Sequence, residues 1–205
     1  MALDAGYGSH EAFSRAFRRQ FGRAPETVSA ARSLADLNLM EPLRMDESLL
    51  IPLAEPRFDQ RGPLRLAGLT ARYSFDTNEG IPAQWQRFAP HIGHVPGQIG
   101  VATYGLCHNF GEDCRFDYTC AVEVSGFDDL PPDFTRASLP AQRYVVFTHE
   151  AHISQMRRTA YTIWAHYLPR SGLRVLSHEN FEFYGPSYDP VTGEGGVEIW
   201  IPLAS

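Results

Sequence analysis

The sequence of 205 residues is long enough for one well-buried domain with a smaller unit beside it, and 43% of its residues are hydrophobic, which supports a folded core. No apolar run approaches the roughly 20 residues of a membrane-spanning helix, and no signal peptide is expected from the first residues. The three cysteines, an odd number without a secretory signal, are therefore expected as reduced thiols in a cytoplasm.

Charge is divided unevenly along the chain. Residues 1–32 hold five arginines against three acidic residues, a net charge of +2, so the total of −6 leaves −8 for residues 33–205. An acidic body repels phosphate backbones. Only the N-terminal piece is therefore a candidate nucleic-acid surface, and the body is expected to prefer neutral or cationic partners.

The first predicted element is a short helix after a Gly-Tyr-Gly turn at residues 6–8. Ser9 is placed to cap this helix by accepting a backbone N–H two or three residues on, and Gly22 and Pro25 end it. Four residues at helical spacing form an apolar stripe, Ala12, Phe13, Ala16 and Phe17. Most of the arginines of the helix lie outside this stripe. A capped helix with one apolar and one basic flank is what a recognition helix in the DNA major groove needs.

This ordered series resembles the second helix-turn-helix of AraC/XylS-type transcription regulators over about 25 residues. The family has a further motif and a long helix before this point, whereas only Met1 to Ala5 precede the turn here, so we expect a truncated regulator that binds DNA only weakly. The alternative is that any small amphipathic helix after a glycine turn carries the pattern. The residues that the resemblance implies for DNA contact are Ser9, His10, Ser14, Arg15, Arg18 and Arg19.

The chain after this helix changes character twice. Residues 33–54 mix apolar residues with two prolines and have no sustained period, which predicts a connector that packs in part on a neighbouring surface. From residue 55, short alternating runs closed by Gly, Pro or Asp clusters predict strands. The predicted strands span residues 64–75, 98–104, 115–124, 143–149, 180–184 and 197–202.

An internal repeat divides the body in two. The pattern Trp85-x2-Phe88-x-Pro90-x2-Gly93 recurs 79 residues later as Trp164-x2-Tyr167-x-Pro169-x2-Gly172. Each copy lies near the end of a predicted helix, about residues 79–91 and about residues 153–168, with one predicted strand before it and two after it. The body is therefore predicted to be a duplicated strand–helix–strand–strand unit.

The predicted fold class is α+β. Two such units side by side form an antiparallel sheet with two helices on one face and a ligand cleft on the other, at the pseudo-twofold axis, preceded by a short helical N-terminal remnant. The expected division is a partial helix-turn-helix DNA-binding remnant at residues 1–32, a connector at residues 33–54 and a ligand-binding domain at residues 55–205.

The duplicated body is similar to the GyrI-like small-molecule-binding domain, which is also the effector domain of Rob-type regulators. The resemblance covers roughly residues 55–205, and a GyrI-like domain behind an AraC-type motif is a known architecture of the family. The most specific parts of the resemblance are Phe-Glu-Phe-Tyr-Gly-Pro at residues 181–186 and Glu-Ile-Trp-Ile-Pro at residues 198–202.

Strand parity assigns the candidate site residues to faces, because alternate residues point to opposite sides. In residues 180–184, Phe181 and Phe183 are expected to face the helix-packed core, so Glu182 and Tyr184 are expected to face the cleft.

In residues 197–201 the same reasoning places Glu198 and Trp200 on the cleft side, while parity leaves the face of Tyr118 open.

A carboxylate among aromatic rings suits a flat or bulky cation, because the rings attract the charge and the buried carboxylate neutralises it. The resemblance implies that Glu182 is the ligand-contacting glutamate. The alternatives are that Glu182 is an exposed residue of a half-solvated sheet and that Trp85 and Trp164 are core residues of their helices. The candidate wall residues are Tyr118, Tyr184, Trp85, Tyr104, Trp164 and Trp200.

Other chemistries find no support in the sequence. The eight histidines and three cysteines form no zinc ligand set of recognised spacing, so no metal is expected. No phosphate-binding glycine loop and no Gly-x-Ser-x-Gly occurs, so neither a cofactor nor a serine nucleophile is expected. No membrane partner is expected, and the oligomeric state is left open.

Two functions are compatible with this pattern. The first is a sensor, the effector domain of an AraC-family regulator that binds an amphipathic cationic or aromatic small molecule. The second is a stand-alone GyrI-like hydrolase, or a drug- or toxin-sequestering protein, that uses Glu182. In the hydrolase, aromatic surroundings raise the pKa of Glu182 toward general-base duty on water. The basic helix favours the sensor, because an enzyme does not need it.

Overall fold

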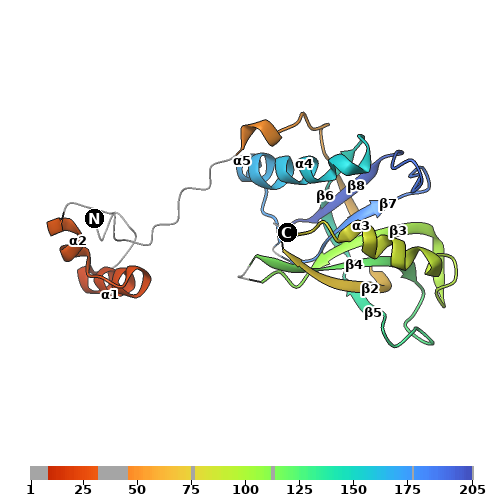
Figure 1. The fold of residues 1–205 in the computed structure, drawn as a ribbon, viewed down its shortest axis with the longest axis horizontal. Helices are drawn as coiled ribbons and strands as arrows, with labels where there is room; N and C mark the ends of the chain where they lie inside the picture. Colours follow the sequence, from red (N-terminus) through yellow and green to blue (C-terminus); the bar gives the residue numbers. More distant parts are fainter. Residues whose placement is uncertain (1–8, 32–45, 75–76, 112–113, 177, 205) are drawn as a thin grey trace. The chain divides into compact units, whose positions relative to one another are not determined.

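The computed structural model describes residues 9–31, 46–74, 77–111, 114–176 and 178–204 (Figure 1). The chain divides into two compact units, Met1–Asp46 and Glu47–Ser205, and each is described here by itself. The predicted glycine turn at residues 6–8 lies outside the described residues.

The N-terminal unit contains helix α1 (His10–Phe21) and helix α2 (Pro25–Ala31). Ser9 has extended backbone, and its hydroxyl accepts the N–H of Ala12 at 3.1 Å, as the sequence predicts for a capping residue. Gly22 ends the helix in the left-handed conformation with φ of 70°, where a residue with a Cβ would be strained. Both ends of α1 are therefore set by local chemistry.

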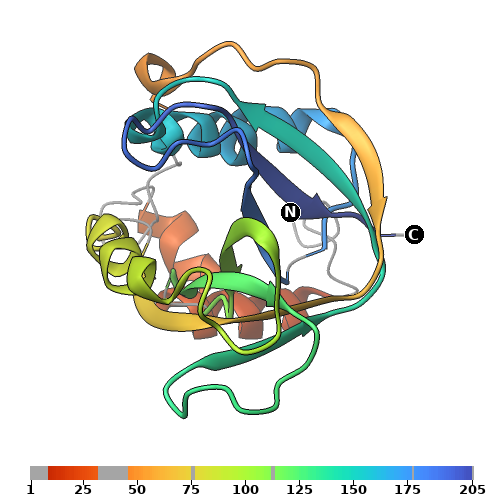
Figure 2. The ribbon, with the colours of Figure 1, turned by 90° about the vertical axis from the view of Figure 1, so that its right-hand side faces the viewer.

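The larger unit is built on one antiparallel sheet with the strand order β1-β6-β8-β7-β3-β4-β2-β5. The sheet curls into a half-barrel (Figure 2). Its strands are β1 (Arg57–Arg61), β2 (Leu64–Ser74), β3 (Gln98–His108), β4 (Arg115–Val124), β5 (Thr135–Leu139), β6 (Gln142–His149), β7 (Asn180–Tyr184) and β8 (Val197–Pro202).

The helical segments of this unit are short, and most of them follow either β2 or β6. They are the 3-10 helix η1 (Glu47–Leu49), α3 (Ile81–Phe88), η2 (Ala89–His91), η3 (Ile153–Gln155), α4 (Met156–Tyr161), the π-helix η4 (Thr162–Tyr167) and α5 (Leu168–Ser171). The second predicted helix is thus a composite, in which a π-helical turn interrupts the α-helix.

The strand order confirms the predicted duplication. The unit β2-α3-β3-β4 and the unit β6-α4-β7-β8 meet where β3 pairs with β7. On each side of this pair the strands follow in the equivalent order, β4 then β2 on one side and β8 then β6 on the other, and β5 and β1 form the two edges. Helix α3 packs over β2 and β4, while η4 and α5 pack over β6 and β8 on the same face. The architecture is therefore a two-layer α+β fold with a pseudo-twofold axis between β3 and β7.

The two edge strands, β1 and β5, were not predicted. Their sequences, Arg-Phe-Asp-Gln-Arg and Thr-Arg-Ala-Ser-Leu, carry too few apolar residues to alternate like the inner strands. Polar side chains are the usual composition of an edge, because they discourage pairing with a further strand.

Part of the predicted connector packs on the second helical segment. Within residues 46–54, the backbone N–H of Ile51 donates to the hydroxyl of Thr162 at 3.2 Å. Leu53 packs against the buried cluster beneath η4 and α5. This stretch is therefore fixed to the body of the larger unit.

Candidate functional site

Glu182 lies near the middle of the sheet, on the face that the helices cover. On β7 it stands opposite Gly105 of β3 and Ile199 of β8, and Gly105 stands opposite Cys120 of β4. Directly opposed residues of antiparallel strands point to the same face. Because Cys120 packs in the cluster beneath α3 and Ile199 in the cluster beneath η4 and α5, Glu182 points to the helix side, between those two halves.

The expected assignment of the two faces of β7 is therefore reversed. Phe181 and Phe183 do not lie beneath the helices; they pack with Tyr104 on the inner face of the curled sheet. Glu182 and Tyr184 share a face as predicted, but it is the helix side. The reason is that the curl gives the inner face an apolar core of its own, so both faces of the sheet bury aromatic residues.

Two tyrosine hydroxyls converge on one oxygen of the Glu182 carboxylate. Tyr118 donates to Oε2 at 2.6 Å and Tyr184 donates to Oε2 at 2.8 Å. The indole N–H of Trp85 donates to the Tyr118 hydroxyl at 3.2 Å. Oε1 accepts no hydrogen bond from the part of the chain that the structure describes, so one carboxylate oxygen keeps its capacity for a ligand. We call these four residues the Glu182 cluster.

Aromatic rings enclose the carboxylate. The rings of Trp85 and Tyr184 meet edge to face at 5.1 Å, and Tyr184 meets Tyr188 in the same way at 4.9 Å. Tyr118 is buried, whereas Glu182 and Trp85 keep partial access to solvent. The site therefore combines a partly accessible carboxylate with aromatic walls, which suits a cation.

Desolvation dominates the electrostatics of the cluster. Burial raises the pKa of Glu182, and the hydrogen bonds from Tyr118 and Tyr184 partly offset that rise. Burial followed by the charge of Glu182 holds the pKa of both tyrosines well above their usual range, so both hydroxyls remain donors at neutral pH. The same two causes raise the pKa of the Cys107 thiol, which remains protonated.

Gln84 fixes α3 over this part of the sheet, and no sequence pattern singled it out. Its buried side-chain amide donates to the backbone carbonyls of Leu69 at 2.7 Å and Tyr118 at 2.8 Å. Trp85 is the next residue of α3, so these two hydrogen bonds also fix the distance of its indole from the sheet and from the Tyr118 hydroxyl. Gln84 is thus a positioning residue for the cluster.

Two of the predicted wall residues, Tyr104 and Trp200, do not join the Glu182 cluster. Both are buried on the inner face, where the guanidinium of Arg61 lies 5.4 Å and 5.5 Å from their ring centroids. Arg61 also donates to the Tyr104 hydroxyl at 2.7 Å and pairs with Glu123 at 3.3 Å. The Arg61 guanidinium therefore already lies over the rings of Tyr104 and Trp200. The prediction that these two rings line the same site as Glu182 is corrected.

Trp164 is the sixth predicted wall residue. It lies on η4, with 42% of its surface exposed, and it has no ring contact with the Glu182 cluster among the described residues. The structure thus brings together Glu182, Tyr118, Tyr184 and Trp85, and leaves Trp164 as an exposed ring on the other helical half.

The residues predicted for DNA contact fall into two groups on α1. The Ser9 hydroxyl is engaged in the helix cap, and His10 and Ser14 both contact Glu26 of α2, at 3.3 Å and 3.2 Å. The second group is exposed to solvent and consists of Arg15, Arg18 and Arg19.

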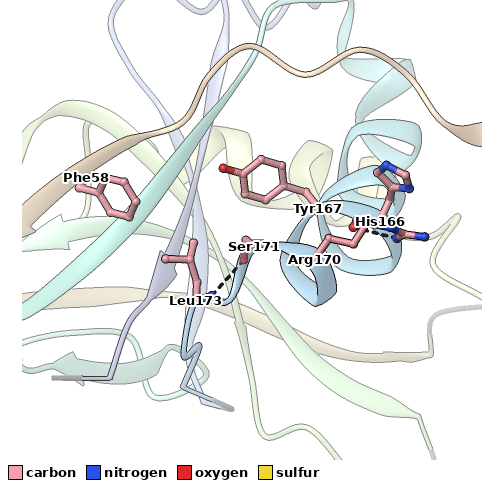
Figure 3. A pocket seen from close by; sticks show the side chains of 6 residues that line it. All are labelled: Phe58, His166, Tyr167, Arg170, Ser171 and Leu173. Carbon is pink, nitrogen blue, oxygen red and sulfur yellow. Dashed lines mark hydrogen bonds between the residues drawn. The ribbon is translucent and has the colours of Figure 1, made fainter.

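A separate hollow of about 310 Å³ lies beside α5 (Figure 3). It holds no carboxylate and shares no residue with the Glu182 cluster, and Phe58 faces the tyrosine of η4 across it. Its chemistry does not match the predicted cation site. The lining residues are Phe58, His166, Tyr167, Arg170, Ser171 and Leu173.

Within the described residues, no group of three His, Cys, Asp or Glu side chains could hold a metal ion. The cysteines Cys107, Cys114 and Cys120 are free. No described helix is both long and apolar enough to cross a membrane.

Comparison with known proteins bears on the larger unit first. The model of the family described as "GyrI-like small molecule binding domain" matches residues 54–204. A solved structure described as SAV2435 bound to tetraphenylphosphonium superimposes with a TM-score of 0.62 and 20% identity, over 74% of this chain and 95% of that one. The fold of residues 54–204 is therefore shared with small-molecule-binding domains.

Two relatives are named as transcriptional regulators. BrlR of Pseudomonas aeruginosa is 29% identical over 121 residues, which are 58% of this chain and 44% of that protein. Rob of Salmonella typhimurium is 25% identical over 211 residues, which are 97% of this chain and 71% of that protein. The chain thus spans less than half of BrlR and about seven tenths of Rob.

Proposed function

Because this chain belongs to the family of GyrI-like small-molecule-binding domains, we propose that it is the ligand-sensing part of an AraC-family transcriptional regulator, and that it binds lipophilic aromatic cations at Glu182. The observation that carries the proposal is the pair of tyrosine hydroxyls on Oε2 of a partly accessible carboxylate. This arrangement orients the carboxylate within aromatic walls and leaves Oε1 toward a ligand.

The charge of the ligand follows from the desolvation of Glu182. An ionised carboxylate with a raised pKa is a group that the fold destabilises, and a cation placed beside it relieves that cost. Neutral ligands offer no such gain. The structural relative bound to tetraphenylphosphonium supports the choice of that cation as a probe.

The experiment compares tetraphenylphosphonium with the neutral triphenylphosphine oxide by titration calorimetry, using Glu182→Gln. This substitution keeps the shape of the side chain and removes its charge. We expect it to weaken the binding of the cation by about 1–3 kcal/mol and the binding of the neutral compound much less. Glu55→Gln, at an exposed position without a described partner, is the matched control. Equal losses for both ligands would rule out Glu182 as the counter-ion.

Support for the regulator half of the proposal comes from the N-terminal unit. Exposed arginines on a capped helix form a basic surface of the kind that contacts phosphates, and the relatives BrlR and Rob are named as transcriptional regulators. In the complete regulator, occupation of the Glu182 cluster would alter engagement of DNA.

A second candidate function, hydrolysis, is favoured by one observation only. Burial raises the pKa of Glu182, and a carboxylate so perturbed can act as a general base on water. Consumption of an electrophilic ester by the wild-type protein, lost in Glu182→Gln while ligand binding persists, would favour the hydrolase over the sensor.

A further inference from the structure

One row of residues crosses the six inner strands of the sheet and contains the two-fold counterpart of Glu182. Read from β2 to β6, its members face one another directly. They are Leu69, Cys120, Gly105, Glu182, Ile199 and Phe147. Outward from the middle of the row, the pairs are Gly105 with Glu182, Cys120 with Ile199 and Leu69 with Phe147, at offsets of 77, 79 and 78 residues, close to the 79 of the sequence repeat. By its place in this row, Gly105 is the counterpart of Glu182 across the pseudo-twofold axis between β3 and β7.

The missing side chain at Gly105 is a requirement of the site. A Cβ added there would overlap the Tyr118 hydroxyl and lie 2.6 Å from Oε2 of Glu182. Gly105 has no positive φ, so conformation does not explain the residue. The hydrogen bond between Tyr118 and Glu182 passes through the space that any other residue would fill.

The two halves of the site are unequal in charge as a result. Glu182 is the one carboxylate in the row. Cys120, which faces Gly105, and Ile199, which faces Glu182, carry no negative charge. Burial and then Glu182 raise the pKa of the Cys120 thiol, whereas Arg87 of α3 lowers it, so a guanidinium also acts on this region. The nearest acidic side chain along the chain, Glu179, pairs with His178 at 3.3 Å, and the next, Asp189, is exposed and accepts from the N–H groups of its own turn.

We infer that the site is built for a single positive charge, and that Gly105, the two-fold counterpart of Glu182, sets this limit. This inference rests on the proposed function and sharpens it to a ligand class, the aromatic monocations. A second charge rigidly attached to such a ligand would enter aromatic surroundings in which the row offers no further carboxylate.

The test uses two ligands of the same two-ring shape. N-methyl-4-phenylpyridinium carries one positive charge, and methyl viologen carries two. We expect the monocation to bind wild-type protein about tenfold more tightly or better in titration calorimetry at fixed ionic strength. Equal or tighter binding of the dication would overturn the inference.

The proposed function fails in a different way. If neither cation binds, or if Glu182→Gln leaves the affinity of the monocation unchanged, the cation site itself is absent. Binding of the monocation that depends on Glu182, together with equal binding of the dication, would leave the site intact and remove only the limit to one charge.

The role of Gly105 is tested with Gly105→Ala, which we expect to weaken the monocation about tenfold or more, because the added methyl group displaces Tyr118 and Glu182. Gly62→Ala is the matched control, since a Cβ at that position meets nothing within 4 Å. Unchanged affinity in a folded Gly105→Ala protein would contradict the assignment. If that variant does not fold, the comparison of the two ligands in wild type decides independently.

Discussion

Trp85 and Tyr118 are joined by a hydrogen bond in which the indole N–H donates to the phenolic oxygen at 3.2 Å. The same phenol donates onward to Glu182 at 2.6 Å. A helix residue is thereby connected to the partly accessible carboxylate through one tyrosine hydroxyl. Removal of that hydroxyl would remove two hydrogen bonds at once, the one to the Glu182 carboxylate and the one from Trp85 of α3.

Tyr118→Phe is expected to weaken the binding of tetraphenylphosphonium at neutral pH. The hydrogen bond from Tyr118 lowers the pKa of Glu182, so its loss raises that pKa further and reduces the ionised fraction. Calorimetry at several pH values should show the apparent pKa for binding shifted upward. Tyr167→Phe, whose ring packs on Phe147 away from the cluster, should show no shift.

Cation binding by the wild-type protein is expected to fall as the pH is lowered. The ionised carboxylate is the form that attracts a cation, and burial raises the pKa of Glu182 above its ordinary value of 4.5. The loss should therefore begin at a higher pH than for an ordinary carboxyl group. A dye-displacement titration from pH 8 to pH 4 measures the midpoint, and a midpoint at or below 4.5 would contradict the assignment.

Glu182→Gln is expected to stabilise the ligand-free protein at neutral pH. A carboxyl group whose pKa is raised by folding adds stability while it is protonated, and that contribution is lost as the pH rises through its folded pKa. The neutral amide avoids this loss, so the free energy of unfolding should be higher for Glu182→Gln than for wild type at pH 7.5. Urea unfolding should show the gain shrinking toward pH 4. Destabilisation at pH 7.5 would contradict the expectation.

His149 is expected to make the larger unit less stable in weak acid. Burial lowers its pKa below 6.5, and the neutral ring is bonded to the Thr159 hydroxyl at 2.7 Å and to the His152 carbonyl at 3.2 Å. Because the unfolded chain binds the proton more readily, the free energy of unfolding should fall as the pH drops below about 6.5. His149→Gln should flatten this dependence. His108, whose pKa burial also lowers, contributes with the same sign and serves as the comparison variant.

Binding to duplex DNA is expected to be weak and to show little sequence preference. The exposed arginines of α1 are Arg15, Arg18 and Arg19, so a plot of log K against log salt should have a slope of about −3 or shallower. Replacement of all three with alanine should abolish a mobility shift at low salt, whereas Arg136→Ala in the larger unit should not. Salt-resistant nanomolar binding to one promoter would contradict this prediction.

The repeat and the strands were predictable because their signals are local. The tryptophan-containing pattern marks two helix ends, and the parity of Glu182 and Tyr184 on β7 is correct. The polar edge strands escaped prediction because partners in the sheet, not their own sequences, define them as strands.

Which face of the sheet holds the site could not be read from the sequence. Trp200 was grouped with Glu182 because parity was counted separately in each strand, whereas the register pairs Glu182 with Ile199 and Phe181 with Trp200. The contact between Tyr118 and Glu182 spans 64 residues and depends on that register. Gly105 gives no signal at all until its place opposite Glu182 is known.

The pairing of Gly105 with Glu182 also constrains how such a chain can descend from a shorter one. A symmetric homodimer of the second half would bring two glutamates face to face across its axis, and their mutual repulsion would keep one of them protonated. A homodimer of the first half would place two glycines there and offer no charge. The one-carboxylate site therefore requires two non-identical halves, which a single fused chain supplies.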